Sequence, residues 1–227
     1  MKAVKAWVAA AAMVALSGAA QAALIDRGGG MIYDTTRNIT WLADMNNAST
    51  SGHTGPGVNA TGRMTWAAAT DWANNLVYGG FSDWRLPTLN PSDTSCTGGF
   101  GVGIGHNCTG GELSGLFVTD LGNKAQESVL NQVGDTAEQI ANLALFSNVQ
   151  SSSYWSGTEL EHALDLNFAW FFNAGDGVQN RVGKFNALYA VAVLPGDVAA
   201  RVPEPQTLAL ALLALGATVV ARRRRPR

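Results

Sequence analysis

The sequence predicts an α+β fold, a single domain with a few helices in the middle of the chain and antiparallel strands from both ends. Short runs rich in β-branched and aromatic residues occur near residues 31–42 and again after residue 153. Apolar residues at helical spacing occur between them. Gly, Asn and Asp separate these runs, as expected for turns. Residues 23–201 are enough for one hydrophobic core.

The first predicted element is a β-hairpin. Met31–Asp34 and Ile39–Leu42 are β-prone, and the polar residues that join them include Asn38, which suits a turn. Residues 46–62 are rich in Asn, Ser, Thr, Gly and Pro, and therefore predict a loop.

The middle of the chain predicts helices. Thr65 can cap a helix over residues 66–76, whose apolar side chains recur at helical spacing. Two further helices are expected over residues 112–121 and 125–145, the second broken near Gly134.

Strands return in the last third of the domain. Tyr154, Trp155 and Ser156 start the first, and residues 163–172 and 187–193 alternate as strands do. Residues 173–177, Asn-Ala-Gly-Asp-Gly, predict a hairpin turn between two of them.

The two cysteines, Cys96 and Cys108, lie in a Gly-rich insertion at residues 90–111. In an exported protein the default is a disulfide, which contributes about 3 kcal/mol for so short a loop. Metal ligation with a histidine is the alternative, although no CxxC or HxxxH spacing occurs. The segment between the cysteines holds five glycines, and we expect it to be peripheral to the core.

Charge disfavours a nucleic-acid partner. Residues 23–201 contain eight basic and sixteen acidic side chains, a formal net charge of −8. An acidic surface repels phosphate backbones, so nucleic-acid binding is not expected.

The N-terminus has the pattern of a secretory signal peptide. Lys2 and Lys5 precede an apolar stretch at residues 6–16, and a small-residue cleavage site ends at Ala22. Residues 1–22 are therefore expected to be removed by signal peptidase, so that the mature chain begins at Ala23.

The C-terminal segment, residues 202–227, combines three parts. Pro203, Glu204 and Pro205 precede an apolar run at residues 207–221, and an arginine cluster follows. This order resembles the PEP-CTERM sorting signal of Gram-negative bacteria. The resemblance implies transient insertion of a C-terminal helix into the inner membrane, processing by an exosortase, and release to the cell surface or beyond. A plain C-terminal membrane anchor is the alternative. In either case the arginines should stay on the cytoplasmic side of the membrane.

Three sequence blocks together resemble the domain once called DUF1566, the C-terminal domain of a Legionella collagen-like adhesin, over about residues 26–197. The motif residues that carry the resemblance are Asp83, Trp84, Arg85, Leu86, Pro87, Tyr154, Trp155 and Ser156. It implies a variant of the C-type-lectin-like folds and extracellular adhesion or glycan contact, without established enzyme chemistry. The family usually has an arginine in its last strand, where this chain has Leu194.

The tryptophans of these blocks have two interpretations. As large apolar side chains they suit a buried scaffold. Exposed, they would form platforms for sugar rings. The residues concerned are Trp41, Trp84, Trp155 and Trp170. Arg85 beside Asp83 suggests charge-assisted hydrogen bonds that tie a turn to the core.

No catalytic motif is assembled in the sequence. GxSxG and HExxH are absent, and a disulfide would remove both thiols. The carboxylates of Glu159, Glu161 and Asp165 leave weak glycosidase chemistry open, and oxygen donors at residues 165–176 leave calcium open. We expect no cofactor and no enzyme. The predicted function is an exported, exosortase-processed, non-catalytic surface or matrix protein that contacts exopolysaccharide, in adhesion or biofilm. A membrane-tethered periplasmic enzyme acting on glycans is the alternative.

Overall fold

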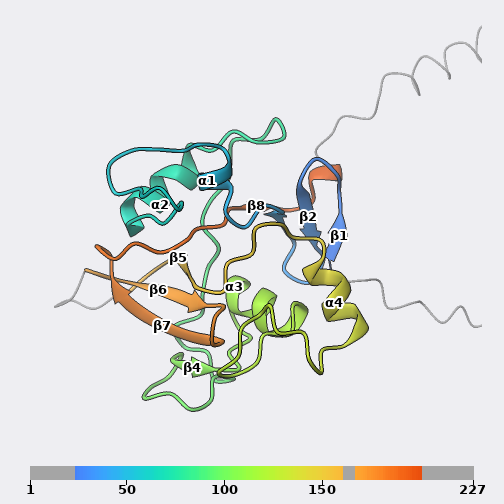
Figure 1. The fold of residues 1–227 in the computed structure, drawn as a ribbon, viewed down its shortest axis with the longest axis vertical. Helices are drawn as coiled ribbons and strands as arrows, with labels where there is room; N and C mark the ends of the chain where they lie inside the picture. Colours follow the sequence, from blue (N-terminus) through green and yellow to red (C-terminus); the bar gives the residue numbers. More distant parts are fainter. Residues whose placement is uncertain (1–23, 161–166, 201–227) are drawn as a thin grey trace, which may run out of the picture.

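The computed structural model describes residues 24–160 and 167–200, and these form two antiparallel four-stranded sheets with a few short helices (Figure 1). The α+β class is therefore confirmed. The first sheet contains β1 (Leu24–Asp26), β2 (Met31–Asp34), β3 (Ile39–Leu42) and β8 (Val193–Pro195), in the order β1-β2-β3-β8. The predicted N-terminal hairpin is β2 and β3, and Asn38 takes the left-handed conformation, with φ of 52°.

The second sheet has the order β4-β7-β6-β5. Its strands are β4 (Gly105–His106), β5 (Ser153–Glu159), β6 (Phe168–Asn173) and β7 (Val178–Gly183). The predicted turn at residues 173–177 joins β6 to β7. Strand β7 was not predicted, because its sequence is mostly polar and gains its order from pairing with β6. The strand predicted over residues 187–193 is wrong, since only Val193 belongs to a strand.

The helices are shorter than predicted. Helix α2 (Trp66–Asn74) is confirmed, and the Thr65 hydroxyl accepts its capping hydrogen bond from the Ala68 amide. The predicted loop at residues 46–62 contains a one-turn helix, α1 (Asn47–Thr50). Helix α3 (Glu112–Gly115) continues into a π-helical turn (Leu116–Asp120), and a 3-10 turn (Val198–Ala200) ends the described chain.

The helix predicted over residues 125–145 is wrong in its first half. Only α4 (Ala137–Leu143) forms, starting at a capping box between Thr136 and Gln139. Upstream, the side chains of Ser128 and Asn131 accept hydrogen bonds from backbone amides two residues later. Such local bonds compete with helix formation, which explains the series of turns in this segment.

The tryptophans are buried scaffold. Trp41 and Trp155 are fully buried, and Trp84 and Trp170 are 2% exposed, so the sugar-platform interpretation is wrong for these four. The Trp155 indole donates to the Met64 carbonyl at 2.7 Å, which fixes β5 against the segment before α2. Leu194, where the DUF1566 resemblance expects an arginine, is also buried.

A buried ion cluster joins the hairpin to the middle of the chain. The Arg37 guanidinium donates to Asp34 at 2.6 Å and to Asp120 at 2.5 Å. The Asp34 side chain is fully buried, and it also accepts from the Trp41 indole at 3.2 Å. Burial raises the pKa of Asp120 although Arg37 opposes the shift. The cluster therefore depends on the arginine charge.

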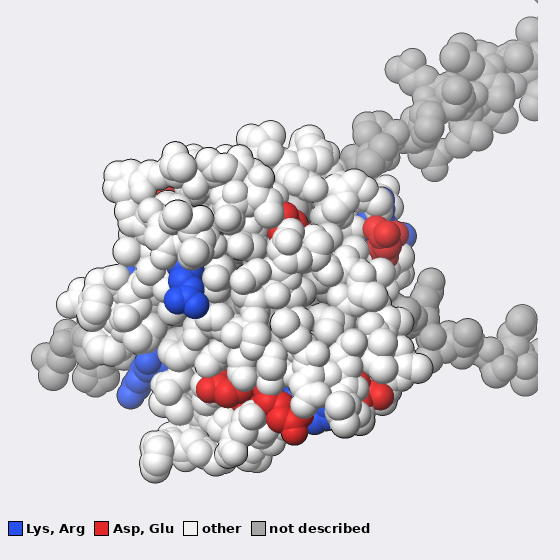
Figure 2. Space-filling model, in the orientation of Figure 1, with Lys and Arg blue, Asp and Glu red and all other residues white. Residues whose placement is uncertain are grey.

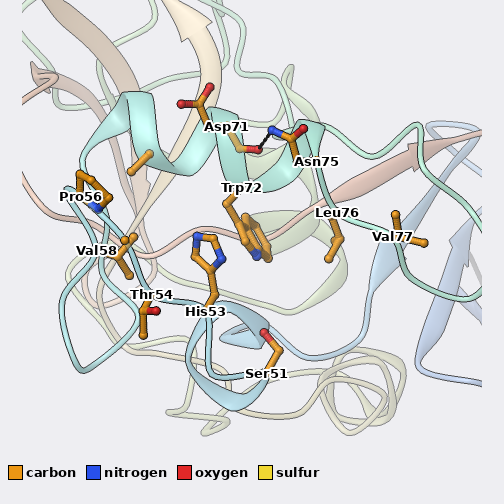
Figure 3. A pocket seen from close by; sticks show the side chains of 12 residues that line it. Ser51, His53, Thr54, Pro56, Val58, Asp71, Trp72, Asn75, Leu76 and Val77 are labelled. Atoms are coloured by element: carbon orange, nitrogen blue, oxygen red, sulfur yellow. Dashed lines mark hydrogen bonds between the residues drawn. The ribbon is translucent and has the colours of Figure 1, made fainter.

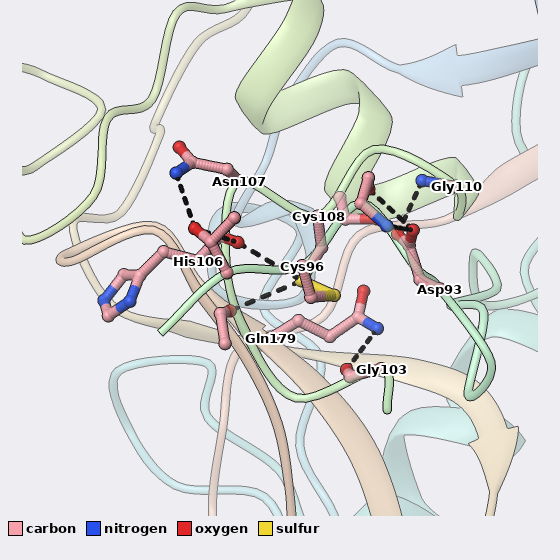
Figure 4. Close-up of a disulfide and its surroundings, with 12 residues drawn as sticks. Asp93, Cys96, Gly103, His106, Asn107, Cys108, Gly110 and Gln179 are labelled. Carbon is pink, nitrogen blue, oxygen red and sulfur yellow. Dashed lines mark hydrogen bonds between the residues drawn. A yellow bond between two sulfur atoms is a disulfide. The ribbon is translucent and has the colours of Figure 1, made fainter. Parts of the chain in front are cut away.

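The predicted disulfide between Cys96 and Cys108 is present, with the sulfur atoms 2.07 Å apart (Figure 4). With both sulfurs bonded to each other, the cysteines are not metal ligands, although the Asp93 carboxylate lies within 4.8 Å of them. The expectation that the loop is peripheral is wrong. Cys108 is fully buried, β4 inside the loop pairs with β7, and Gln179 donates to the Gly103 carbonyl at 2.8 Å. The β4–β7 pairing and the Gln179 side-chain bond make the loop part of the second sheet.

Replacing both cysteines by serine should lower the free energy of unfolding by about 3 kcal/mol, because the unfolded chain regains the entropy of a short closed loop. The β4–β7 pairing and the Gln179 bonds should still hold the fold. Thermal melting and circular dichroism of Cys96→Ser/Cys108→Ser, beside reduced and oxidised wild type, measure this. An unfolded double variant under conditions where reduced wild type stays folded would contradict the prediction.

Several predicted segments lie outside the described residues: the signal peptide at 1–22 with its cleavage site at Ala22 and Ala23, the motif Pro203, Glu204 and Pro205, and the apolar run at 207–221. Within residues 24–160 and 167–200, no helix has the length and apolarity needed to cross a membrane.

Candidate functional site

The family-motif residues serve the fold. The Arg85 guanidinium forms a two-pronged ion pair with Glu112, at 2.7 and 2.6 Å. The Glu112 carboxylate also accepts from the Thr88 amide at 2.8 Å. The pair therefore fastens the segment after α2 to the start of α3. Sequence reasoning did not find this partner, because Glu112 is 27 residues from Arg85 in the chain.

The remaining motif side chains are also structural. Trp84, Leu86 and Pro87 are buried, as are Tyr154 and Trp155. The Ser156 hydroxyl donates to the Trp170 carbonyl at 2.8 Å, across the β5–β6 pair.

The Glu112 carboxyl has a lowered pKa. Burial alone would raise the pKa, but the hydrogen bonds from Arg85 and the Thr88 amide outweigh burial. A carboxyl whose pKa is lower in the folded than in the unfolded state contributes stability above its unfolded pKa. That contribution disappears as the pH falls through the lower, folded value.

Glu112→Gln should therefore lose stability at neutral pH and show a shallower loss on acidification from pH about 5 downward. Chemical denaturation at pH 7 and at several pH values between about 5 and 2.5 measures both effects. Glu138→Gln, an exposed change on α4, is the matched control and should follow wild type. Parallel pH curves for Glu112→Gln and wild type would contradict the assignment.

A concave surface with polar and apolar lining lies between the loop at residues 51–58 and helix α2 (Figure 3). The hollow has a volume of about 460 Å³, within the range of small-molecule sites. Its lining is Ser51, His53, Thr54, Gly55, Pro56, Val58, Ala68, Asp71, Trp72, Asn75, Leu76 and Val77. We call this hollow the α2 hollow. Sequence reasoning missed it, because residues 46–62 read only as a loop.

Free polar groups surround an apolar floor in the α2 hollow. Trp72 is 4% exposed and lies beside the His53 imidazole in Figure 3, with Leu76 on the same side of α2. The side chains of Ser51, His53 and Thr54 make no hydrogen bond or ion pair within the described residues. These groups are available to a ligand.

Backbone bonds hold the loop that forms one wall. The Thr65 amide donates to the Gly57 carbonyl at 2.9 Å, joining the loop to the cap of α2. Gly57 has φ of 78°, and a Cβ there would lie 2.5 Å from the Thr65 hydroxyl. Asn59 accepts from the Thr61 and Arg63 amides at 3.0 Å each. The wall is therefore built before any ligand arrives.

A smaller hollow adjoins the first. It has a volume of about 320 Å³ and shares His53, Thr54 and Val58 with the α2 hollow. Its other lining residues are Ser49, Gly52, Asn59 and Ala60. We call it the loop hollow. A third hollow, of about 590 Å³, is lined partly by Leu160, which directly precedes residues outside the described part of the chain.

The structure places several of the groups that the sequence offered for catalysis or calcium binding. Within the described residues, no hydrogen bond joins the His53 imidazole to the Ser51 hydroxyl, so no base is positioned next to this nucleophile. Of the carboxylates considered for glycoside chemistry, Glu159 forms an ion pair with Lys184, and the other two lie outside the described residues. Asn173 and Asp176 accept bonds from turn amides, as turn residues do.

Comparison with known proteins gives one match. Residues 201–225 match the PEP-CTERM protein-sorting motif, which includes Pro203, Glu204 and Pro205. No curated protein and no solved structure matches the chain, and the DUF1566 resemblance therefore gains no support. The match confirms the sorting motif that the sequence predicted, and it implies an exported protein that is processed by an exosortase and sorted to the cell surface.

Proposed function

We propose that this chain is a non-catalytic surface or extracellular-matrix protein that binds exopolysaccharide in the α2 hollow. The observation that carries the proposal is the set of unengaged polar side chains, Ser51, His53 and Thr54, around the apolar floor of Trp72. Sorting to the cell surface, which the motif implies, supports the proposal, because secreted polysaccharides occur there.

Saccharides suit this lining for a physical reason. A sugar ring presents hydroxyl groups at its edge and C–H groups on its faces. Sites for such ligands combine apolar contact with a small number of placed polar groups. The α2 hollow offers hydroxyls, an imidazole and an amide on its sides, with Leu76 and Val58 as apolar walls.

The resemblance to the adhesin-type domain and to lectin-like folds agrees with this proposal and remains part of it. Adhesion or biofilm formation would follow if the surface-sorted protein held polysaccharide chains. The DUF1566 resemblance expects an arginine in the last strand, where this chain has the buried Leu194. Any saccharide binding by this chain therefore does not use an arginine at that position.

His53→Ala should weaken saccharide binding at least tenfold, since it removes a ring that lines both hollows. Isothermal titration of the full-length chain in detergent, with the host's exopolysaccharide and with hits from a glycan array, measures the affinity. His106→Ala, a partly buried histidine in β4, is the matched control and should bind as wild type does. Folded protein that binds no saccharide would refute the proposed function.

A further inference from the structure

We propose that the α2 hollow and the loop hollow together form one extended site for an uncharged oligosaccharide of at least two sugar units. This inference rests on the proposed function and specifies its ligand. The juxtaposition that carries it is the shared wall of His53, Thr54 and Val58.

The two hollows lie along one loop and share three lining residues. Residues 49–60 supply the whole lining of the smaller hollow and half of that of the larger one. His53 belongs to both, and Figure 3 shows its imidazole between the loop and α2, beside Trp72. A ligand that contacts His53, Thr54 or Val58 from one hollow therefore touches part of the lining of the other.

The shared residues suit the middle of a chain molecule. His53 and Thr54 have unengaged polar groups, and Val58 is a partly buried apolar side chain between them and α2. A glycosidic linkage lying over these three residues would place one unit against Trp72 and Leu76. The next unit would lie against Asn59 and Ala60.

Charge selects the class of sugar. Neither hollow has a lysine or arginine in its lining, and the one carboxylate, Asp71, lies exposed at the edge of the larger hollow. Figure 2 shows acidic and basic side chains in small separate groups, with little charge over α1 and α2. Polysaccharides that bear carboxylates or sulfates would find no lysine or arginine in the lining, and the acidic chain would repel them.

The inference predicts that affinity depends on oligosaccharide length. Titrating the full-length chain in detergent with neutral oligosaccharides of one to six units should show at least a tenfold gain between one and three units. Acidic oligosaccharides of the same lengths should bind at least tenfold more weakly. Ala60→Trp places a large side chain in the loop hollow and should remove the gain in affinity with length.

Ala137→Trp, the same change on exposed α4, is the control and should keep the full length dependence. Equal affinity for one and six units, or an Ala60→Trp variant that keeps the gain, would overturn the two-hollow site while saccharide binding stands. Tighter binding of the acidic series would overturn the uncharged class. If no saccharide of either series binds, the proposed function itself fails.

Discussion

Substituting the sorting motif with Pro203→Ala, Glu204→Ala and Pro205→Ala should abolish processing of the chain. In a host with its exosortase, wild type should lose the C-terminal segment near residues 203–205 and leave the membrane fraction. The triple variant should keep the whole segment, including the arginines, and remain with the inner membrane. The expected effect is close to all-or-none, because an uncut tail keeps its cytoplasmic arginines, which are expensive to move through lipid.

Intact-mass measurement of protein recovered from membrane and extracellular fractions reads this out. Gln206→Ala, directly after the motif, is the matched control and should be processed like wild type. Deleting the exosortase should reproduce the triple variant. If wild type itself keeps residues 206–227, sorting is refuted, and the alternative of a permanently tethered periplasmic protein is favoured.

Arg37→Met should destabilise the domain by about 3–5 kcal/mol, because it leaves two carboxylates buried without a cation. Asp34 is fully buried and Asp120 is 7% exposed, so neither regains hydration in the variant. The free energy of unfolding of a typical domain is about 5–15 kcal/mol, so a loss of this size leaves a marginal fold.

Denaturant unfolding at pH 7 and pH 4 measures the loss in free energy of unfolding and the direction in which that loss changes with pH. Burial raises the pKa of Asp120 even beside Arg37. Without the arginine, the protonated form of Asp120 is favoured further in the folded state, so the variant's deficit should be smaller at pH 4. Arg181→Met, at an exposed position of β7, is the control and should change stability by less than about 0.5 kcal/mol. A deficit that does not exceed the control's would show that the cluster does not hold the two segments together.

The sequence predicted features whose cause is local. Thr65 caps α2 because its own hydroxyl reaches an amide three residues later. Asn38 turns the β2–β3 hairpin because its short polar side chain tolerates the left-handed conformation. The sorting motif is likewise a local order of residue types, and the comparison confirmed it without any contact elsewhere in the chain.

Burial by residue type was also predictable in part. Trp41, Trp84, Trp155 and Trp170 are buried scaffold, since a domain gains most stability by enclosing its largest apolar side chains. The disulfide followed from two cysteines in an exported chain. Neither argument showed where these groups lie relative to the sheets, and the loop of Cys96 and Cys108 was therefore wrongly placed outside the core.

Tertiary structure alone decided the pairings between distant residues. Arg37 meets Asp120 and Arg85 meets Glu112 because the fold brings segments together that are 83 and 27 residues apart. Strand β7 is polar and forms because β6 and β4 supply its hydrogen bonds. The α2 hollow exists because the loop at residues 51–58 is held against α2 through Gly57 and Thr65. Propensity and periodicity describe a residue and its near neighbours, whereas a concave site depends on which surfaces meet, and that is decided only when the whole chain packs.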